Sequence, residues 1–179
     1  DQDTKSQNDR TWCFWEKDNR SPFDAIIHRQ WQKVYFHGTN FSAALNLGDY
    51  SYKWLRGIDF YDFVKTDLAS NPNIRFVQEH IERIKDTPTG GFVITTENQY
   101  LAEYVFDSTK SLKLNLADCH NMLQHFKGWE IVTNKPVFDP TCPTMMDYRV
   151  EQRGVGVRFM YVLPESPTRA MVEYTVFSE

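Results

Sequence analysis

Glu173 has the most distinctive chemical setting in the sequence, because it is the one carboxylate in the apolar segment 170–177. The composition of this segment is typical of a strand, and alternation places Glu173 on one face with Met171 and Phe177. Since both faces are mostly apolar, we expect a strand that is buried on both sides. A carboxyl group removed from water favours its protonated form, which is the form that a general acid needs. The alternative is that Glu173 points to solvent or pairs with an arginine such as Arg169.

Glu130, Asp147 and Arg149 are second-rank candidates for a site. Glu130 follows Gly128-Trp129, and a glycine beside a tryptophan suggests a bulge or a close backbone approach, so Glu130 could face a cavity. A cross-strand ion pair or a turn is the alternative for this residue. Asp147 and Arg149 are two positions apart, so on a strand they share a face and could pair, either in a site or as ordinary surface residues.

Several other kinds of chemistry have little support in the sequence. His120 and His125 match no standard zinc spacing, so we predict no metal site. No Gly-x-Ser-x-Gly elbow is present, and Gly154-Val155-Gly156 lacks the third glycine and the following helix of a dinucleotide-binding loop. The cysteines are odd in number and widely spaced, which favours reduced thiols in a cytosolic setting over a disulfide scaffold. They are Cys13, Cys119 and Cys142.

The composition limits the class of protein. The 179 residues suffice for one domain, or for one domain and part of another, and carry a net charge of −4 without charge blocks. This balance argues against nucleic-acid binding, and the 15% aromatic content argues against disorder. The aromatic residues have two interpretations, core packing or an apolar ligand channel whose rings stabilise a cation. The longest apolar run is 159–163, which is too short to span a bilayer.

The elements that must position these residues can be read from the hydrophobic pattern. We expect a polar surface loop over 1–11, a helix that starts at Gly57 and stops before Pro72, and one or two strands within 74–84. Further strands are predicted at 31–38, 50–56, 92–96, 146–150, 156–163 and 170–177. Helix and strand are mixed early and strands prevail late, which indicates an α+β or mixed α/β fold.

Six parts of the sequence resemble, in the same order, motifs of the bacterial lycopene β-cyclases, a family of FAD-dependent carotenoid cyclases. They are 8–16, 28–38, 55–61, 104–108, 124–130 with 146–148, and 161–164 with 167–175. One such motif alone would be weak, but six collinear motifs cover nearly the whole chain.

The resemblance implies a partial FAD-binding domain, Rossmann-like and of the hydroxylase type, interleaved with a mixed β-sheet substrate domain. It implies a connector loop at 1–30, substrate-domain strands at 31–57, a remnant of the FAD-binding domain at 58–110 and the substrate-binding β-sheet domain at 111–179. The chain begins with Asp1 and lacks the Gly-rich FAD motif, so we expect an internal part of a longer enzyme that continues in both directions.

The activity implied by the resemblance is a non-redox isomerisation by an intramolecular lyase. An acid protonates the ψ-end of lycopene, the resulting tertiary carbocation closes a six-membered ring, and proton loss gives the β-ionone ring. The resemblance assigns the acid/base role to Glu173, keeps Glu130, Asp147 and Arg149 as further site residues, and places Arg56 and Asp107 near the cofactor.

The resemblance also implies partners and a location. The complete enzyme would use reduced FAD, with NADPH as the reductant, collect lycopene at a membrane surface, and lie in the cytoplasm, peripheral to the inner membrane. We expect no nucleic-acid partner. The alternatives are a flavin-dependent oxidoreductase of the related hydroxylase or prenyl-reductase type, or a fragment that only binds an apolar ligand, and we expect the isolated chain to be inactive.

Overall fold

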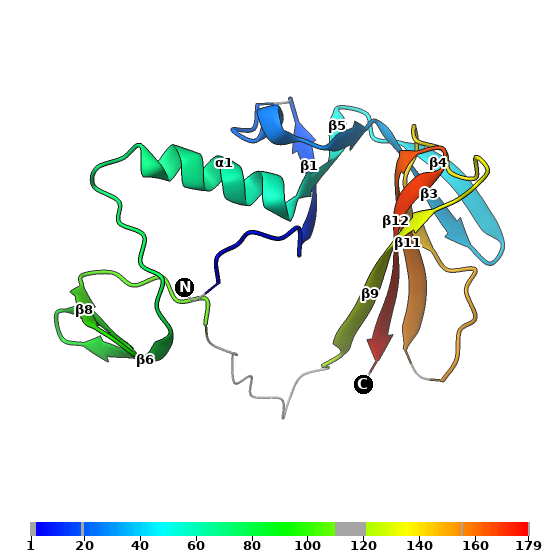
Figure 1. Ribbon diagram of the computed structural model, residues 1–179. Coiled ribbons are helices and arrows are strands. Elements are labelled where there is room, and N and C mark those ends of the chain that lie inside the picture. The colour runs from blue at the N-terminus through cyan, green and yellow to red at the C-terminus, as the bar shows by residue number, and fades with distance from the viewer. Residues whose placement is uncertain (1–2, 19, 110–120, 155, 179) are drawn as a thin grey trace. The chain divides into compact units, whose positions relative to one another are not determined.

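The computed structural model in Figure 1 describes residues 3–18, 20–109, 121–154 and 156–178. The chain divides into two units. The first unit comprises Asp1–Asp9 with Ile58–Asn115, and the second comprises Arg10–Gly57 with Leu116–Glu179.

The second unit contains a small antiparallel sheet of three strands in the order β1-β5-β2. Its strands are β1 (Thr11–Lys17), β2 (Arg29–Trp31) and β5 (Tyr50–Arg56), with a short 3-10 helix at Asp24–Ile26. β1 and β5 pair along their full length, from Thr11 opposite Arg56 to Lys17 opposite Tyr50. The dense aromatic segment near the N-terminus is therefore a strand, and the connector loop predicted over 1–30 is wrong for these residues.

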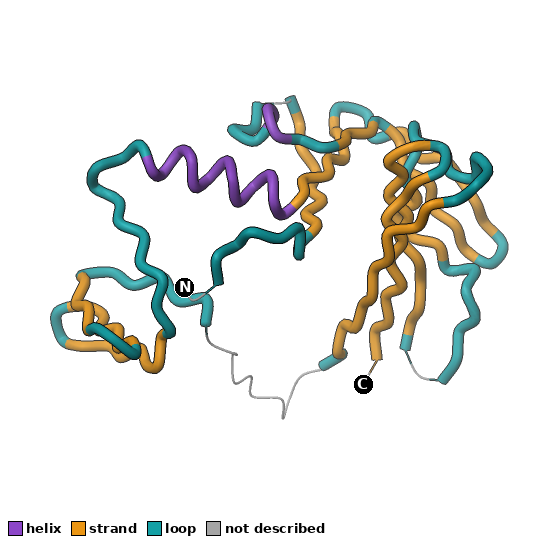
Figure 2. The backbone as a smooth tube through the Cα atoms, in the orientation of Figure 1, coloured by secondary structure: helices purple, strands orange, loops and turns teal. Residues whose placement is uncertain are grey.

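A mixed sheet of six strands completes the second unit, in the order β4-β3-β10-β11-β12-β9. The strands are β3 (Lys33–Gly38), β4 (Phe41–Asn46), β9 (Leu123–Val132), β10 (Thr144–Asp147), β11 (Val157–Ser166) and β12 (Arg169–Ser178). β10 and β3 are parallel, whereas the other neighbours are antiparallel. Figure 2 shows these strands as the larger group of orange segments.

The core of the second unit joins its two sheets. Trp31, Tyr52 and Trp54 of the small sheet cluster with Val34 and Leu163 of the large sheet, and each of these residues is at most 6% exposed. The rings of Trp31 and Trp54 stack with their centroids 6.4 Å apart. Burial of such large aromatic side chains fixes one face of the small sheet against the large one.

The first unit consists of one helix and an antiparallel sheet in the order β6-β7-β8. The elements are α1 (Gly57–Ala69), β6 (Ile81–Thr87), β7 (Gly90–Thr95) and β8 (Gln99–Ala102). The helix prediction is confirmed. The strand prediction over 74–84 holds only for its last residues, because the chain is irregular before Ile81. The described helices include none that is long and apolar enough to cross a membrane.

The mixed α+β class agrees with this architecture, but the Rossmann-like assignment stays a prediction. A Rossmann unit requires parallel strands joined by a helix. In the described residues of the first unit, every strand pair is antiparallel.

Candidate active site

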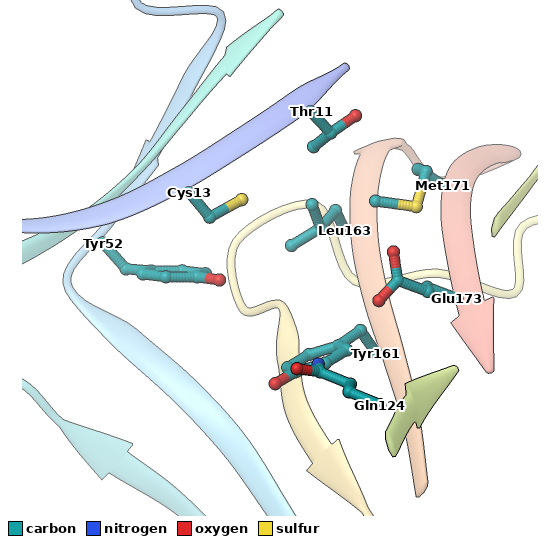
Figure 3. A pocket seen from close by; sticks show the side chains of 8 residues that line it. All are labelled: Thr11, Cys13, Tyr52, Gln124, Tyr161, Leu163, Met171 and Glu173. Carbon is teal, nitrogen blue, oxygen red and sulfur yellow. The ribbon is translucent and has the colours of Figure 1, made fainter. Parts of the chain in front are cut away.

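The second unit contains a cavity of about 350 Å³ into which the carboxylate of Glu173 points (Figure 3). Its lining comes from β1, β5, β9, β11 and β12. The lining residues are Thr11, Cys13, Tyr52, Gln124, Tyr161, Leu163, Met171 and Glu173.

Strand register explains why Glu173 reaches this cavity. On β12 the side chains of Met171 and Glu173 share a face, and their direct partners on β11 are Leu163 and Tyr161. All of these side chains line the cavity. Each face of β12 contains a fully buried residue, since Ala170 on one face and Thr175 on the other are 0% exposed, whereas Met171 and Glu173 are only partly buried.

The groups around Glu173 are neutral at physiological pH. Burial raises the pKa of the Cys13 thiol to about 11, and burial likewise raises the pKa of the Tyr52 phenol, which donates a hydrogen bond to the Cys13 sulfur. The pKa of Tyr161 is raised by burial and then by the negative charge of Glu173. The Thr175 hydroxyl donates a hydrogen bond to Oε1 of Glu173 at 3.1 Å. The lining residues include no lysine or arginine.

Glu130 occupies an exposed position on β9. Its carboxylate accepts a hydrogen bond from Nε of Arg169 at 2.6 Å, and the side chain is 57% exposed. The same guanidinium contacts Glu165, with Nε and Oε2 2.9 Å apart. The cross-strand ion pair considered for Glu130 is therefore present, and Arg169 is engaged with these carboxylates instead of the Glu173 carboxylate.

Asp147 and Arg149 form an ion pair outside the residues that line the cavity. Arg149 donates to both carboxylate oxygens of Asp147, from Nε at 2.8 Å and from the terminal nitrogen at 2.6 Å. These bonds lower the pKa of Asp147. Because Arg149 already satisfies this carboxylate, the pair is suited to fixing the end of β10.

The two residues expected near the cofactor lie in different units. Arg56 ends β5 directly opposite Thr11, which lines the cavity. Asp107 follows β8 in the first unit, where its Oδ1 accepts hydrogen bonds from the backbone N–H and the hydroxyl of Thr109.

Cys13, Tyr52, Tyr161 and Gln124 are cavity residues that were not predicted from the sequence. The sequence holds one partial signal, which is the two-residue spacing that places Tyr52 on the same strand face as Trp54. The structure adds that Cys13 lies directly opposite Trp54. Local alternation does not reveal which sheet this face meets. The four side chains converge because strands that are far apart in the chain pack together.

The described residues do not fit the pyrophosphate site of FAD. That site needs backbone N–H groups exposed at a helix N-terminus after a parallel strand. Here the N–H of Gly57 donates to the carbonyl oxygen of Arg10 at 2.8 Å, and a Cβ at Gly57 would lie 3.0 Å from that oxygen. β5, which precedes α1, has only antiparallel neighbours.

No group of three or more potential metal ligands occurs in the part of the chain that the structure describes. Of the two histidines considered above for zinc, His120 lies outside the described residues, as does Cys119.

The fold and the cavity define a mixed β-sheet domain that holds a carboxylate among neutral side chains. A family model described as "Lycopene cyclase protein" matches residues 2–179, and the chain belongs to this lycopene cyclase family. A lycopene beta-cyclase from Paracoccus sp. (strain N81106 / MBIC 01143) is 46% identical over 56 residues, which are 31% of this chain and 14% of the relative. No solved structure matches the chain.

Proposed function

We propose that the chain is the substrate-binding part of a lycopene β-cyclase, an intramolecular lyase in which Glu173 is the acid/base residue. The observation that carries the proposal is the position of the Glu173 carboxylate inside a cavity whose other titratable groups are neutral. Membership of the lycopene cyclase family and the similarity to a lycopene beta-cyclase support the choice of substrate and reaction.

The reaction conserves protons and electrons. The protonated carboxyl of Glu173 transfers its proton to the terminal double bond of the ψ-end, which leaves a tertiary carbocation. A neighbouring double bond of the same substrate attacks this cation and closes the six-membered ring. Loss of a ring proton to the carboxylate forms the β-ionone double bond and restores the acid.

The lining side chains suit a cationic intermediate. The aromatic faces of Tyr52 and Tyr161 and the sulfur of Met171 are electron-rich and uncharged. Exclusion of water from the site in the complete enzyme would protect the cation from capture as an alcohol. The volume of about 350 Å³ is near the lower end of the roughly 300–1,000 Å³ that is typical of small-molecule sites. It therefore suits one end group of a carotenoid better than a complete carotenoid.

We include in the proposal that the complete enzyme uses reduced FAD with NADPH as the reductant. The flavin would supply electrostatic stabilisation or proton transfer near the cation, while the residues described here bind and protonate the end group. We also propose that the enzyme takes lycopene from a membrane surface and lies in the cytoplasm, peripheral to the inner membrane, without a nucleic-acid partner.

The proposal is tested with the full-length protein that contains this chain, supplied with lycopene and reduced FAD. Glu173→Gln removes the proton donor with little change in size, so turnover should fall by roughly 100-fold or more. Glu151→Gln is the matched control, because this side chain is 67% exposed and pairs with Arg153. Near-normal β-carotene output from Glu173→Gln would remove Glu173 from the mechanism.

The mass of the product distinguishes the alternatives. Cyclisation leaves the mass of lycopene unchanged, whereas hydroxylation or reduction changes it. A product of altered mass would replace the cyclase proposal with a flavin-dependent oxidoreductase.

A further inference from the structure

The strand beside Glu173 has a glycine at the position directly opposite the carboxylate. β12 and β9 are antiparallel, and Glu173 pairs with Gly128 near the middle of β9. Direct cross-strand partners place their side chains on the same face of the sheet. Any side chain at position 128 would therefore lie on the cavity face, next to Glu173.

The backbone does not require glycine at this position. Gly128 is not among the glycines with positive φ, so its conformation is open to any residue. Glycine also weakens a strand, because it adds conformational entropy to the unfolded chain and has no side chain to pack. The missing side chain itself is therefore the feature that needs an explanation.

The space above Gly128 leads to the carboxylate. A Cβ at this position would lie 3.5 Å from the sulfur of Met171 and 4.0 Å from Oε2 of Glu173. These are ordinary contact distances, so a methyl group fits and a larger side chain would extend over the carboxylate. The neighbours of Gly128 on the same face, Phe126 and Glu130, are both large.

We infer that Gly128 is the residue that sets the width of the apolar substrate end able to reach Glu173. The inference rests on the proposed function, since it names the access of the substrate to that acid. Proton transfer to carbon needs the reacting atoms about 3–3.5 Å apart. A side chain whose first carbon is already 4.0 Å from Oε2 competes with the substrate for this approach. The glycine keeps the approach open for a slender isoprenoid terminus.

The experiment compares Gly128→Ala and Gly128→Val in the full-length protein. Access is measured without substrate, by peptide mass spectrometry of Glu173 after reaction with dicyclohexylcarbodiimide or with the slimmer diisopropylcarbodiimide. Labelling by the bulky reagent should fall roughly tenfold or more in Gly128→Val, because the valine side chain would extend over the carboxylate. The decrease in labelling should be smaller in Gly128→Ala than in Gly128→Val. In both variants it should also be smaller for diisopropylcarbodiimide than for dicyclohexylcarbodiimide. Turnover of lycopene should follow the same order.

Thermal stability separates access from a structural role. Valine favours strands, so the melting temperature of Gly128→Val should stay the same or rise while labelling and turnover fall. His125→Val is the matched control, because position 125 lies on the opposite face of β9, paired with Val176. This control should label and turn over as the unmodified protein does. If Gly128→Val lowers the melting temperature, labelling of Glu173 in Gly128→Ala tests the inference instead. The methyl group of this variant fits at contact distance.

The outcomes distinguish this inference from the proposed function. Equal labelling of Glu173 by the bulky reagent in the glycine, alanine and valine proteins would overturn the inference, whatever the role of Glu173. Reduced labelling together with normal turnover of Glu173→Gln would leave Gly128 in control of access and refute the acid role.

Discussion

Lys53 provides a direct test of how the small sheet is held in place. Its side chain is completely buried on β5, on the face opposite Tyr52 and Trp54, and its ammonium group binds the carboxylates of Glu16 and Asp24. Burial alone would lower the pKa of Lys53, but hydrogen bonds from the ammonium to these carboxylates outweigh it and raise the pKa. The substitution Lys53→Met keeps the apolar stem and removes the charge.

The expected loss follows from what remains after the substitution. Removing one partner of a buried ion pair costs about 3–5 kcal/mol, because the other charge stays buried without compensation. The side chain of Asp24 is 38% exposed and can be solvated, whereas that of Glu16 is only 17% exposed. We therefore expect the lower end of the range, about 3 kcal/mol, which corresponds to a decrease of roughly 6–12 °C in melting temperature.

The assay is urea and thermal unfolding of the protein followed by tryptophan fluorescence. Lys17→Met is the control, because the ion pair of Lys17 with Asp49 is exposed, and it should cost less than about 1 kcal/mol. Glu16→Gln added to Lys53→Met should restore part of the loss, since it removes the uncompensated charge. Equal losses for Lys53→Met and Lys17→Met would refute the reasoning.

The pH dependence adds an independent check. A lysine whose pKa is raised on folding contributes stability that is fully present below its unfolded pKa of about 10.4. This contribution is lost as the pH rises through the higher pKa of the folded state. The difference between the unmodified protein and Lys53→Met should therefore be constant at neutral pH and shrink only above about pH 10.4.

Four further predictions concern the second unit. The alkylation rate of Cys13 should reach its half-maximum near the pKa of about 11, and a midpoint near 8.5, the value of an ordinary thiol, would contradict its burial. Gly156→Ala should destabilise the protein by about 2–3 kcal/mol, because φ is +106° and a Cβ would lie 2.0 Å from a backbone oxygen. Gly154→Ala, with φ of +66° and open space, should cost only about 1 kcal/mol in the same unfolding assay. Thr175→Val, which removes the hydrogen bond to Glu173 at 3.1 Å, should cost about 1–2 kcal/mol by urea unfolding, and an unchanged midpoint would show that the bond contributes nothing.

The sequence was informative where a segment has a clear periodicity or a distinctive composition. The helix at Gly57–Ala69 could be predicted because its apolar residues repeat at helical spacing, and the strand β12 because its composition is typical of a buried strand. β9 was not delimited in the same way, since its residues are exposed along almost the whole strand and show no buried face. The irregular segment before Ile81 has apolar residues without an alternating pattern, and this mixed phase is what misled the prediction.

The candidate site was only partly accessible to sequence reasoning. Glu173 could be found, because a carboxylate in an apolar strand is unusual. Cys13 and Tyr52 could not, because their approach to Glu173 depends on how the small sheet packs on β11 and β12. For Glu130, the deciding contact is with Arg169 on the neighbouring strand, and that contact depends on the register of β9 against β12.

The parallel pairing of β10 with β3 determines the order in which the nascent chain can fold. Tyr35 emerges from the ribosome long before its partner Thr144, and the whole segment Ile58–Asn115 is synthesised between them. Until then the hairpin of β3 and β4 has an unpaired edge, which is a site for aggregation. The large sheet can therefore be completed only after its last strands have been synthesised. We expect this late, long-range pairing to be slower than formation of the locally connected α1 and β6–β8.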